Sequence, residues 1–201
     1  ASPENFLYQS GYLTLREGTT NDYSLDYPNT EVLNSMSSLL TSNIVGDDNY
    51  ESFRNNICKH LLNKNKDGFK DVLNMLLSKI PYDDYAKAAQ QVIQNEDYKF
   101  PAQEWLYRST ILSFLQGCGV VVEAELHTFK GRPDLVISYR GSTFILEFKV
   151  AFKSEDVQVK LAEAATQIRE KEYIKPYPNA TCLAMVIDDT QRQIVECEKV
   201  E

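Results

Sequence analysis

Residues 131–150, GRPDLVISYRGSTFILEFKV, predict two antiparallel strands joined by a tight turn. We expect strands over 134–139 and 144–152, because β-branched and aromatic residues dominate both runs. Arg140-Gly141 lies between the runs and fits a two-residue hairpin turn, although Arg-Gly is not the dipeptide that such turns favour most. This hairpin is the predicted centre of the fold.

The hairpin register brings two carboxylates together. With Tyr139 paired to Ser142, counting outward along both strands places Asp134 opposite Glu147. Paired side chains lie on one face of the sheet with Cβ atoms about 5 Å apart. Two ionised carboxylates at that distance repel each other unless a cation lies between them. A bulge would shift the register by one residue and make the pair diagonal.

Charged residues inside the second apolar strand indicate chemistry. Glu147 and Lys149 share the face opposite to Phe148, because side chains alternate along a strand. Asp134 and Glu147 fit a hard divalent cation such as Mg²⁺ or Mn²⁺, which polarises a phosphodiester and acidifies a bound water. Lys149 would orient that water or stabilise charge developing on the phosphate. The alternative is a ladder of cross-strand ion pairs on a solvated face, and spacing alone does not separate the two.

The segments that flank the hairpin extend it into an α/β domain. The order helix, three strands, helix, strand is predicted for residues 101–201, with a short fifth strand at the end. The expected helices cover 102–115 and a segment capped by Ser154 that ends before Pro176, and the remaining strands cover 120–126, 181–187 and 193–196.

Residues 1–100 have a different character. Two short strands are expected over 6–15 and 23–27, and apolar residues then recur at helical spacing. We therefore divide the chain into a mostly helical region with a small β-hairpin (1–100) and an α/β domain (101–201). The expected helices run from a cap at Asn29 or Thr30 to about residue 40, over 47–62, over the apolar stripe between Phe69 and Ile80, and over 82–95.

Composition and charge limit the classes of function. Hydrophobic residues make up 43% of the 201, so a disordered chain is excluded, and no apolar run approaches the roughly 18 residues of a membrane span. The four cysteines are scattered and the two histidines have no paired spacing, so a zinc site is not expected. We expect a cytoplasmic protein, since no signal peptide is present. Ala1 in place of Met indicates a fragment or a processed chain.

The net charge of −8 argues against a protein that coats nucleic acid through bulk charge. Residues 1–100 hold 9 basic and 14 acidic residues, whereas 101–201 hold 12 and 15. Four of the latter acids are candidate site residues, so the acidity lies mostly in the helical region and the site. Six basic residues could still form a modest basic rim that faces phosphates: Lys130, Arg132, Lys153, Lys160, Arg169 and Lys171.

With Pro133-Asp134 followed by Glu147-Phe148-Lys149, the segment 104–196 resembles the PD-(D/E)XK nuclease superfamily. The resemblance implies a restriction-endonuclease-like αβββαβ core, with a mixed central sheet flanked by helices. The chain is similar to a bacterial branch of uncharacterised proteins in which an ATPase-like domain lies upstream. Residues 7–14, LYQSGYLT, and 27–32, YPNTEV, extend this resemblance to the N-terminal region.

The resemblance also implies roles for individual residues. Asp134 and Glu147 become metal ligands, the Phe148 carbonyl becomes a third ligand, and Lys149 becomes the catalytic lysine. Glu104 matches an acidic residue that reaches the metal directly or through water; its alternative role is an i,i+4 pair with Arg108.

Three further residues are candidates for the same site, each with a plain alternative. Gln167 matches a polar site position or is a solvated helix residue. Glu125 is a further metal ligand or a strand-edge charge. Arg132 contacts a substrate phosphate or is an ordinary charged residue of the protein surface.

Two functions follow from these observations. The first is Mg²⁺-dependent hydrolysis of nucleic acid, which we expect to be DNA. The second is a nuclease-fold module of weak or absent activity that binds nucleic acid or a protein partner. A membrane partner is not expected, and the sequence sets no oligomeric state.

Overall fold

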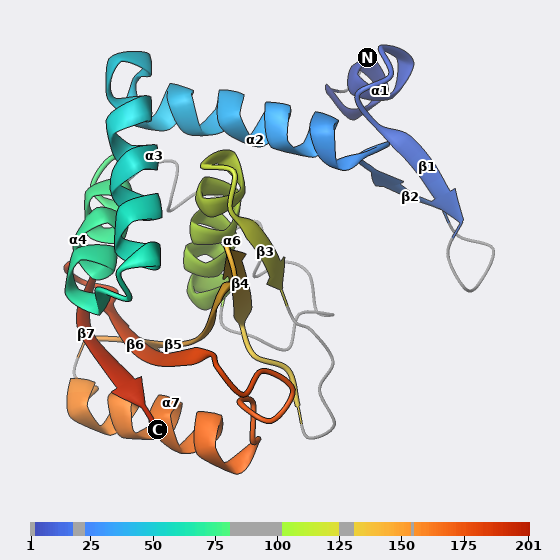
Figure 1. Cartoon of the computed structure of the whole chain (residues 1–201). Helices are drawn as coiled ribbons and strands as arrows, with labels where there is room; N and C mark the ends of the chain where they lie inside the picture. Colours follow the sequence, from blue (N-terminus) through green and yellow to red (C-terminus); the bar gives the residue numbers. More distant parts are fainter. Residues whose placement is uncertain (1–2, 18–22, 81–101, 125–130, 154) are drawn as a thin grey trace.

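A computed structural model gives the fold and describes residues 3–17, 23–80, 102–124, 131–153 and 155–201 (Figure 1). A five-stranded mixed sheet in the order β3-β4-β5-β6-β7 forms its centre. The strands are β3 (Val121–Ala124), β4 (Leu135–Tyr139), β5 (Ser142–Ala151), β6 (Thr181–Asp188) and β7 (Gln193–Val200). Helices cover both faces of this sheet, so the predicted α/β class is confirmed.

The predicted hairpin register is confirmed over the whole of β4. Tyr139 pairs with Ser142 and Leu135 pairs with Leu146, in the antiparallel sense. Arg140 and Gly141 form the turn with φ angles of 46° and 81°. Positive φ at both central residues is the geometry of the tight turn that matches strand twist, and glycine adopts it without strain.

The crossover from β5 to β6 makes the sheet mixed. Strands β5 and β6 are parallel, and α7 (Val157–Glu170) connects them. Asp156 caps α7 by accepting from the backbone N–H groups of Gln158 and Val159. The prediction that Ser154 caps this helix was wrong, because the carboxylate two residues later satisfies the free N–H groups at the helix start. Ser154 itself lies outside the described residues.

The two faces of the sheet bury separate apolar clusters. On one face, Leu146, Phe148 and Met185 join the core beneath the helices α3, α4 and α6. On the other, Ile145 and Ala184 pack against α7. This alternation is the period-2 pattern predicted for β5, with Glu147 and Lys149 on the α7 face.

Three helices of the N-terminal region share the first of these cores. They are α2 (Thr30–Val45), α3 (Asp47–Leu62) and α4 (Lys66–Leu77), and they pack with α6 (Ala102–Gly117). Asn29 caps α2 as predicted, whereas α2 runs five residues beyond the expected end near residue 40. On α4, the Asn74 side chain exchanges hydrogen bonds with the backbone of Ile194 on β7. The boundary at residue 100 stays a prediction, as does the helix over 82–95, which lies outside the described residues.

The start of the chain forms an arm at the far end of α2 (Figure 1). It consists of α1 (Pro3–Gln9) and the antiparallel hairpin of β1 (Thr14–Glu17) and β2 (Tyr23–Asp26). The predicted hairpin is confirmed, but a strand over 6–15 was wrong for its first part. Proline suits the first turn of a helix, and Gly11 at φ 82° ends this one.

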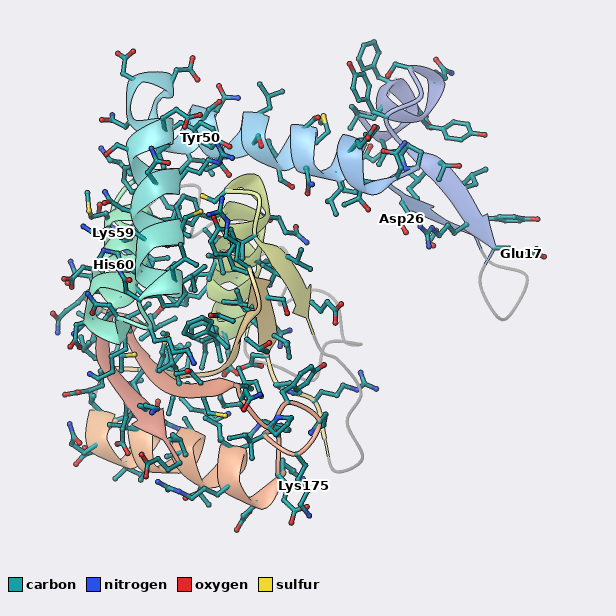
Figure 2. All side chains as sticks on the ribbon, viewed as in Figure 1. Glu17, Asp26, Tyr50, Lys59, His60 and Lys175 are labelled. Atoms are coloured by element: carbon teal, nitrogen blue, oxygen red, sulfur yellow. The ribbon has the colours of Figure 1, made fainter. Side chains whose placement is uncertain are left out.

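Most side chains of the two arm strands are exposed, and Figure 2 labels Glu17 and Asp26 at opposite ends of their hairpin. Phe6 and Tyr23 are each 66% exposed. The arm therefore adds little to the packed core. Among the described helices, none has the length and apolar character that crossing a bilayer requires.

Candidate active site

Asp134 lies one residue before β4, at the end of the confirmed register. Continuing that register by one residue places it opposite Glu147. Its side chain is buried, and its Oδ2 accepts a hydrogen bond of 2.8 Å from the backbone N–H of Phe148. The N–H and C=O of one strand residue point to the same side, so the Phe148 carbonyl lies on the Asp134 side of β5.

Arg108 reaches the same carboxylate from α6. Its Nη1 donates to Asp134 Oδ1 at 3.0 Å, and both side chains are almost fully buried. From the sequence, Arg108 was predicted only as a partner of Glu104, one helical turn earlier. That i,i+4 spacing was the available signal, because it places both residues on the helix face that meets Asp134.

Glu147 is the most deeply buried charged residue of the site, with 1% of its surface exposed. Its Oε1 accepts from Lys149 Nζ at 3.2 Å. Its Oε2 has no hydrogen-bond partner among the described residues. A buried acceptor without a partner is costly and indicates a missing ligand or an unusual protonation state.

Burial raises the pKa of all three acids of the site. It raises the pKa of Glu147 to about 8, and the nearby Asp134 carboxylate adds to the shift. The pKa of Asp134 is raised by burial, against the opposing effects of the Phe148 N–H and Arg108. Burial and Asp134 also raise the pKa of Glu104 on α6. An added cation would stabilise the charged forms of all three groups.

Lys149 is held by a chain of hydrogen bonds that crosses the site. Its Nζ donates to Gln167 Oε1 on α7 at 2.9 Å. Gln167 Nε2 donates to the Tyr173 hydroxyl at 3.4 Å, and that hydroxyl donates to the Arg132 carbonyl at 2.8 Å. The alternative of a solvated Gln167 therefore does not describe this structure. Tyr173 was not predicted from the sequence, since nothing in its spacing marks it.

These groups line one cavity of about 450 Å³ between α6, the β4–β5 hairpin and α7. Gly131 lies where a Cβ atom would come within 3.1 Å of Lys171 and 3.3 Å of the Tyr173 hydroxyl. The missing side chain lets the backbone before Asp134 approach the end of α7 closely. The lining residues are Glu104, Arg108, Gly131, Arg132, Asp134, Glu147, Lys149, Gln167, Lys171 and Tyr173.

The donor set fits a hard divalent cation with a small number of protein ligands. Asp134 retains lone pairs beyond its two hydrogen bonds, and Glu147 Oε2 has no other partner among the described residues. Oxygen ligands with waters completing the shell are typical of Mg²⁺. Within the described part of the chain, no three Asp, Glu, His or Cys side chains group closely enough to hold a metal. Glu104 lines the cavity, so this arrangement fits contact through water rather than direct ligation.

The residues of the predicted basic rim differ in whether they line the cavity. Of the predicted basic rim, Arg132 and Lys171 line the cavity, and Arg132 is exposed. Lys153, Lys160 and Arg169 are absent from its lining, and Lys160 pairs instead with Glu155 and Glu163. Glu125 and Lys130 lie outside the described residues.

The chain is similar to known proteins in two comparisons. Residues 102–197 match the model of a family described as the PD-(D/E)XK nuclease superfamily, which supports the resemblance drawn from the sequence. A curated protein of Azotobacter chroococcum mcd 1, "Uncharacterized protein in vnfD 5'region", is 28% identical over 182 residues. The aligned part covers 88% of this chain and 32% of that protein, so the chain spans about a third of the length of the curated relative it matches.

Proposed function

We propose that the chain is a metal-dependent nuclease of the PD-(D/E)XK type, which hydrolyses phosphodiester bonds in DNA. One observation carries the proposal: a buried Glu147 oxygen without a described hydrogen-bond partner lies in a cavity with Asp134 and Lys149. A solvated ladder of ion pairs would leave these carboxylates exposed, whereas Asp134 and Glu147 are 5% and 1% exposed.

In this proposal Asp134 and Glu147 hold Mg²⁺ or Mn²⁺, with the Phe148 carbonyl as a further ligand. The bound cation supplies Lewis acidity toward the phosphate and lowers the pKa of a coordinated water. Asp134 is oriented for this role by the Phe148 N–H and by Arg108. Glu104, which lines the same cavity, would contact the metal through a water.

Lys149 is the proposed catalytic lysine. Its ammonium group lies beside Glu147 and is fixed by Gln167, so its remaining N–H can donate into the cavity. There it orients the attacking water or stabilises charge on the phosphate. Arg132 and Lys171 at the cavity are the groups that we propose to contact neighbouring phosphates.

Cleavage of supercoiled plasmid and of labelled oligonucleotides tests this function. We expect nicking that requires Mg²⁺ or Mn²⁺ and that falls at least about 1000-fold in Asp134→Asn, Glu147→Gln and Lys149→Met, since each removes a metal ligand or the positioned cation. Lys160→Ala is the matched control, because Lys160 is a lysine outside the cavity lining. Metal-dependent cleavage that persists in all three site variants would refute the assignment.

A second candidate function is a nuclease-fold module without catalysis, which binds nucleic acid or a protein partner. Arg108 favours it, because a buried guanidinium already neutralises Asp134 without a metal. The net charge of −8 also disfavours tight DNA binding. In this case DNA or a partner binds equally well with EDTA and with Mg²⁺, and no substrate is cut.

The organisation of the longer protein is also a proposal. We propose that residues 101–201 form the nuclease-like domain, that 1–100 join it to an upstream ATPase-like domain, and that the protein acts in the cytoplasm. Cleavage activity of a chain that includes the upstream part, measured with and without ATP, tests this arrangement.

A further inference from the structure

Tyr173 follows α7 and connects the apolar core to the cavity. Only 1% of its surface is exposed, and its ring belongs to the cluster between α7 and the sheet. Its hydroxyl lies at the cavity and contacts both Gln167 and the backbone of Arg132. From this placement we infer that Tyr173 is a positioning residue, which fixes Lys149 through Gln167 and holds the segment at Arg132. The inference rests on the proposed function.

The polarity of each group allows one direction for the hydrogen-bond chain. The Lys149 ammonium group only donates, so Gln167 must present its carbonyl oxygen to it. The Gln167 amide nitrogen also only donates, and it donates to the Tyr173 hydroxyl oxygen. The single proton of Tyr173 is then directed to the Arg132 carbonyl at 2.8 Å. Each orientation therefore fixes the next one.

The chain links three separate elements of the site. Lys149 lies on β5, Gln167 on α7, and Arg132 on the segment that leads into β4. The close approach at Gly131 brings the backbone of that segment within reach of the Tyr173 hydroxyl. The Tyr173 hydroxyl thus connects Lys149, which is proposed to orient the attacking water, to the Arg132 segment, which is proposed to contact the substrate.

Removal of this hydroxyl affects two quantities. Tyr173→Phe keeps the buried ring but removes the partner of the Arg132 carbonyl and of the Gln167 amide. A misplaced Lys149 lowers kcat, for which we expect about a tenfold loss. A loosened Arg132 segment weakens substrate contact, for which we expect an increase in KM of about threefold.

The kinetic test compares Tyr173→Phe, Gln167→Leu, the double variant and Tyr177→Phe. The control Tyr177 lies in the same segment and packs against the same core, but no hydrogen bond of its hydroxyl is described. Gln167→Leu should lower kcat about tenfold with KM unchanged, because Tyr173 still holds Arg132. For kcat the double variant should match the more severe single variant, since both break one chain. Losses that multiply, or an equal loss in Tyr177→Phe, would overturn the inference.

A second measurement needs no activity. The side-chain amide signals of Gln167, followed by NMR, should shift in Tyr173→Phe and in Lys149→Met but not in Tyr177→Phe. Backbone amides of Gly131, Arg132 and Asp134 should exchange faster in Tyr173→Phe alone, and Mn²⁺ affinity should stay within about twofold of the parent. If the parent chain cuts no substrate, the proposed function fails while these spectra still test the chain. Unchanged Gln167 signals in Tyr173→Phe would overturn it.

Discussion

Strand β5 buries one apolar and one charged side chain to the same degree on its two faces, with different consequences. Phe148 and Glu147 are neighbours, and each is 1% exposed. Phe148 joins the apolar core under α3, α4 and α6, where its burial stabilises the fold. Glu147 lies on the α7 face with a raised pKa and an oxygen that no described residue satisfies. One strand therefore carries both a stabilising contact and a group whose burial costs free energy.

This difference shows where function is built into the fold. Burial of an apolar ring needs no partner, whereas a buried carboxylate needs a cation or a set of donors. Arg108 and the Phe148 N–H supply such donors to Asp134, and Glu147 receives one from Lys149. The face on which a buried acceptor lacks a described partner is the one that can bind a ligand.

The largest effect is expected for Glu147→Gln, with opposite signs for activity and stability. Cleavage should fall at least about 1000-fold, because a metal ligand is lost. In EDTA at pH 8 the free energy of unfolding should rise by about 1–3 kcal/mol, because an isosteric amide removes the buried charge and its repulsion with Asp134. Urea denaturation followed by circular dichroism measures the second effect. A variant less stable than the parent in EDTA would contradict the contrast.

Phe148→Ala probes the other face of the strand. We expect the free energy of unfolding to fall by about 3–5 kcal/mol, because truncation leaves a cavity in the core. The backbone N–H that orients Asp134 is retained, so cleavage by the folded fraction should fall by less than about tenfold. Thermal and urea unfolding with Mg²⁺ present measure the stability change. A loss of activity as large as that of Glu147→Gln, in fully folded protein, would show that the two faces are not separable.

The stability of the metal-free protein should depend on pH in a defined direction. Glu147 has a folded-state pKa of about 8, above its ordinary value of 4.5, and Asp134 and Glu104 shift the same way. The contribution of Glu147 is fully present below about pH 4.5 and is lost as the pH rises through 8, and Asp134 and Glu104 act in the same direction. The melting temperature in EDTA should therefore decrease over this interval, and 10 mM Mg²⁺ should reverse the decrease at pH 8. Glu147→Gln should flatten the profile, and an unchanged slope in that variant would exclude Glu147 as its source.

The smallest effect is expected for Lys160→Ala. This half-buried lysine pairs with the exposed Glu155 and Glu163 and is absent from the cavity lining. Partly exposed pairs of this kind contribute little to stability. Activity should change by less than about twofold and the melting temperature by less than about 2 °C. A larger loss of cleavage with an unchanged melting temperature would extend the substrate surface beyond the cavity.

Much of the fold was predictable because its signals are local. The run 131–150 set the hairpin, and period-2 alternation placed Glu147 and Lys149 on the face opposite to Phe148. The arm was harder, since Phe6 and Tyr8 favour strands while Pro3 and Gly11 delimit a helix. The end of α2 was missed because tertiary contacts, such as the burial of Val45, extend it beyond its local signals.

The site was predictable only where strand pairing defines it. Asp134 and Glu147 follow from register, and Lys149 follows from alternation. For Arg108 the i,i+4 spacing to Glu104 was a signal, but its contact with Asp134 depends on how α6 packs against the sheet. Tyr173 meets the site through the packing of the segment after α7, which no spacing in the sequence encodes. Gln167 came only from a family resemblance, because a glutamine on a helix has no chemical signature of its own.

Calorimetric titration of Mn²⁺ into the parent chain and into Glu147→Gln measures whether Glu147 is a metal ligand. The buried Glu147 oxygen without a described partner is claimed to be a metal ligand. The account predicts one Mn²⁺ per chain in the parent, bound with proton release at pH 7 because Glu147 must ionise. The affinity for Mn²⁺ should be at least about tenfold weaker in Glu147→Gln. Loss of a residue that only hydrogen-bonds a metal ligand already weakens metal binding by that factor. Absence of binding to the parent at millimolar Mn²⁺, or equal affinity in the variant, would contradict it.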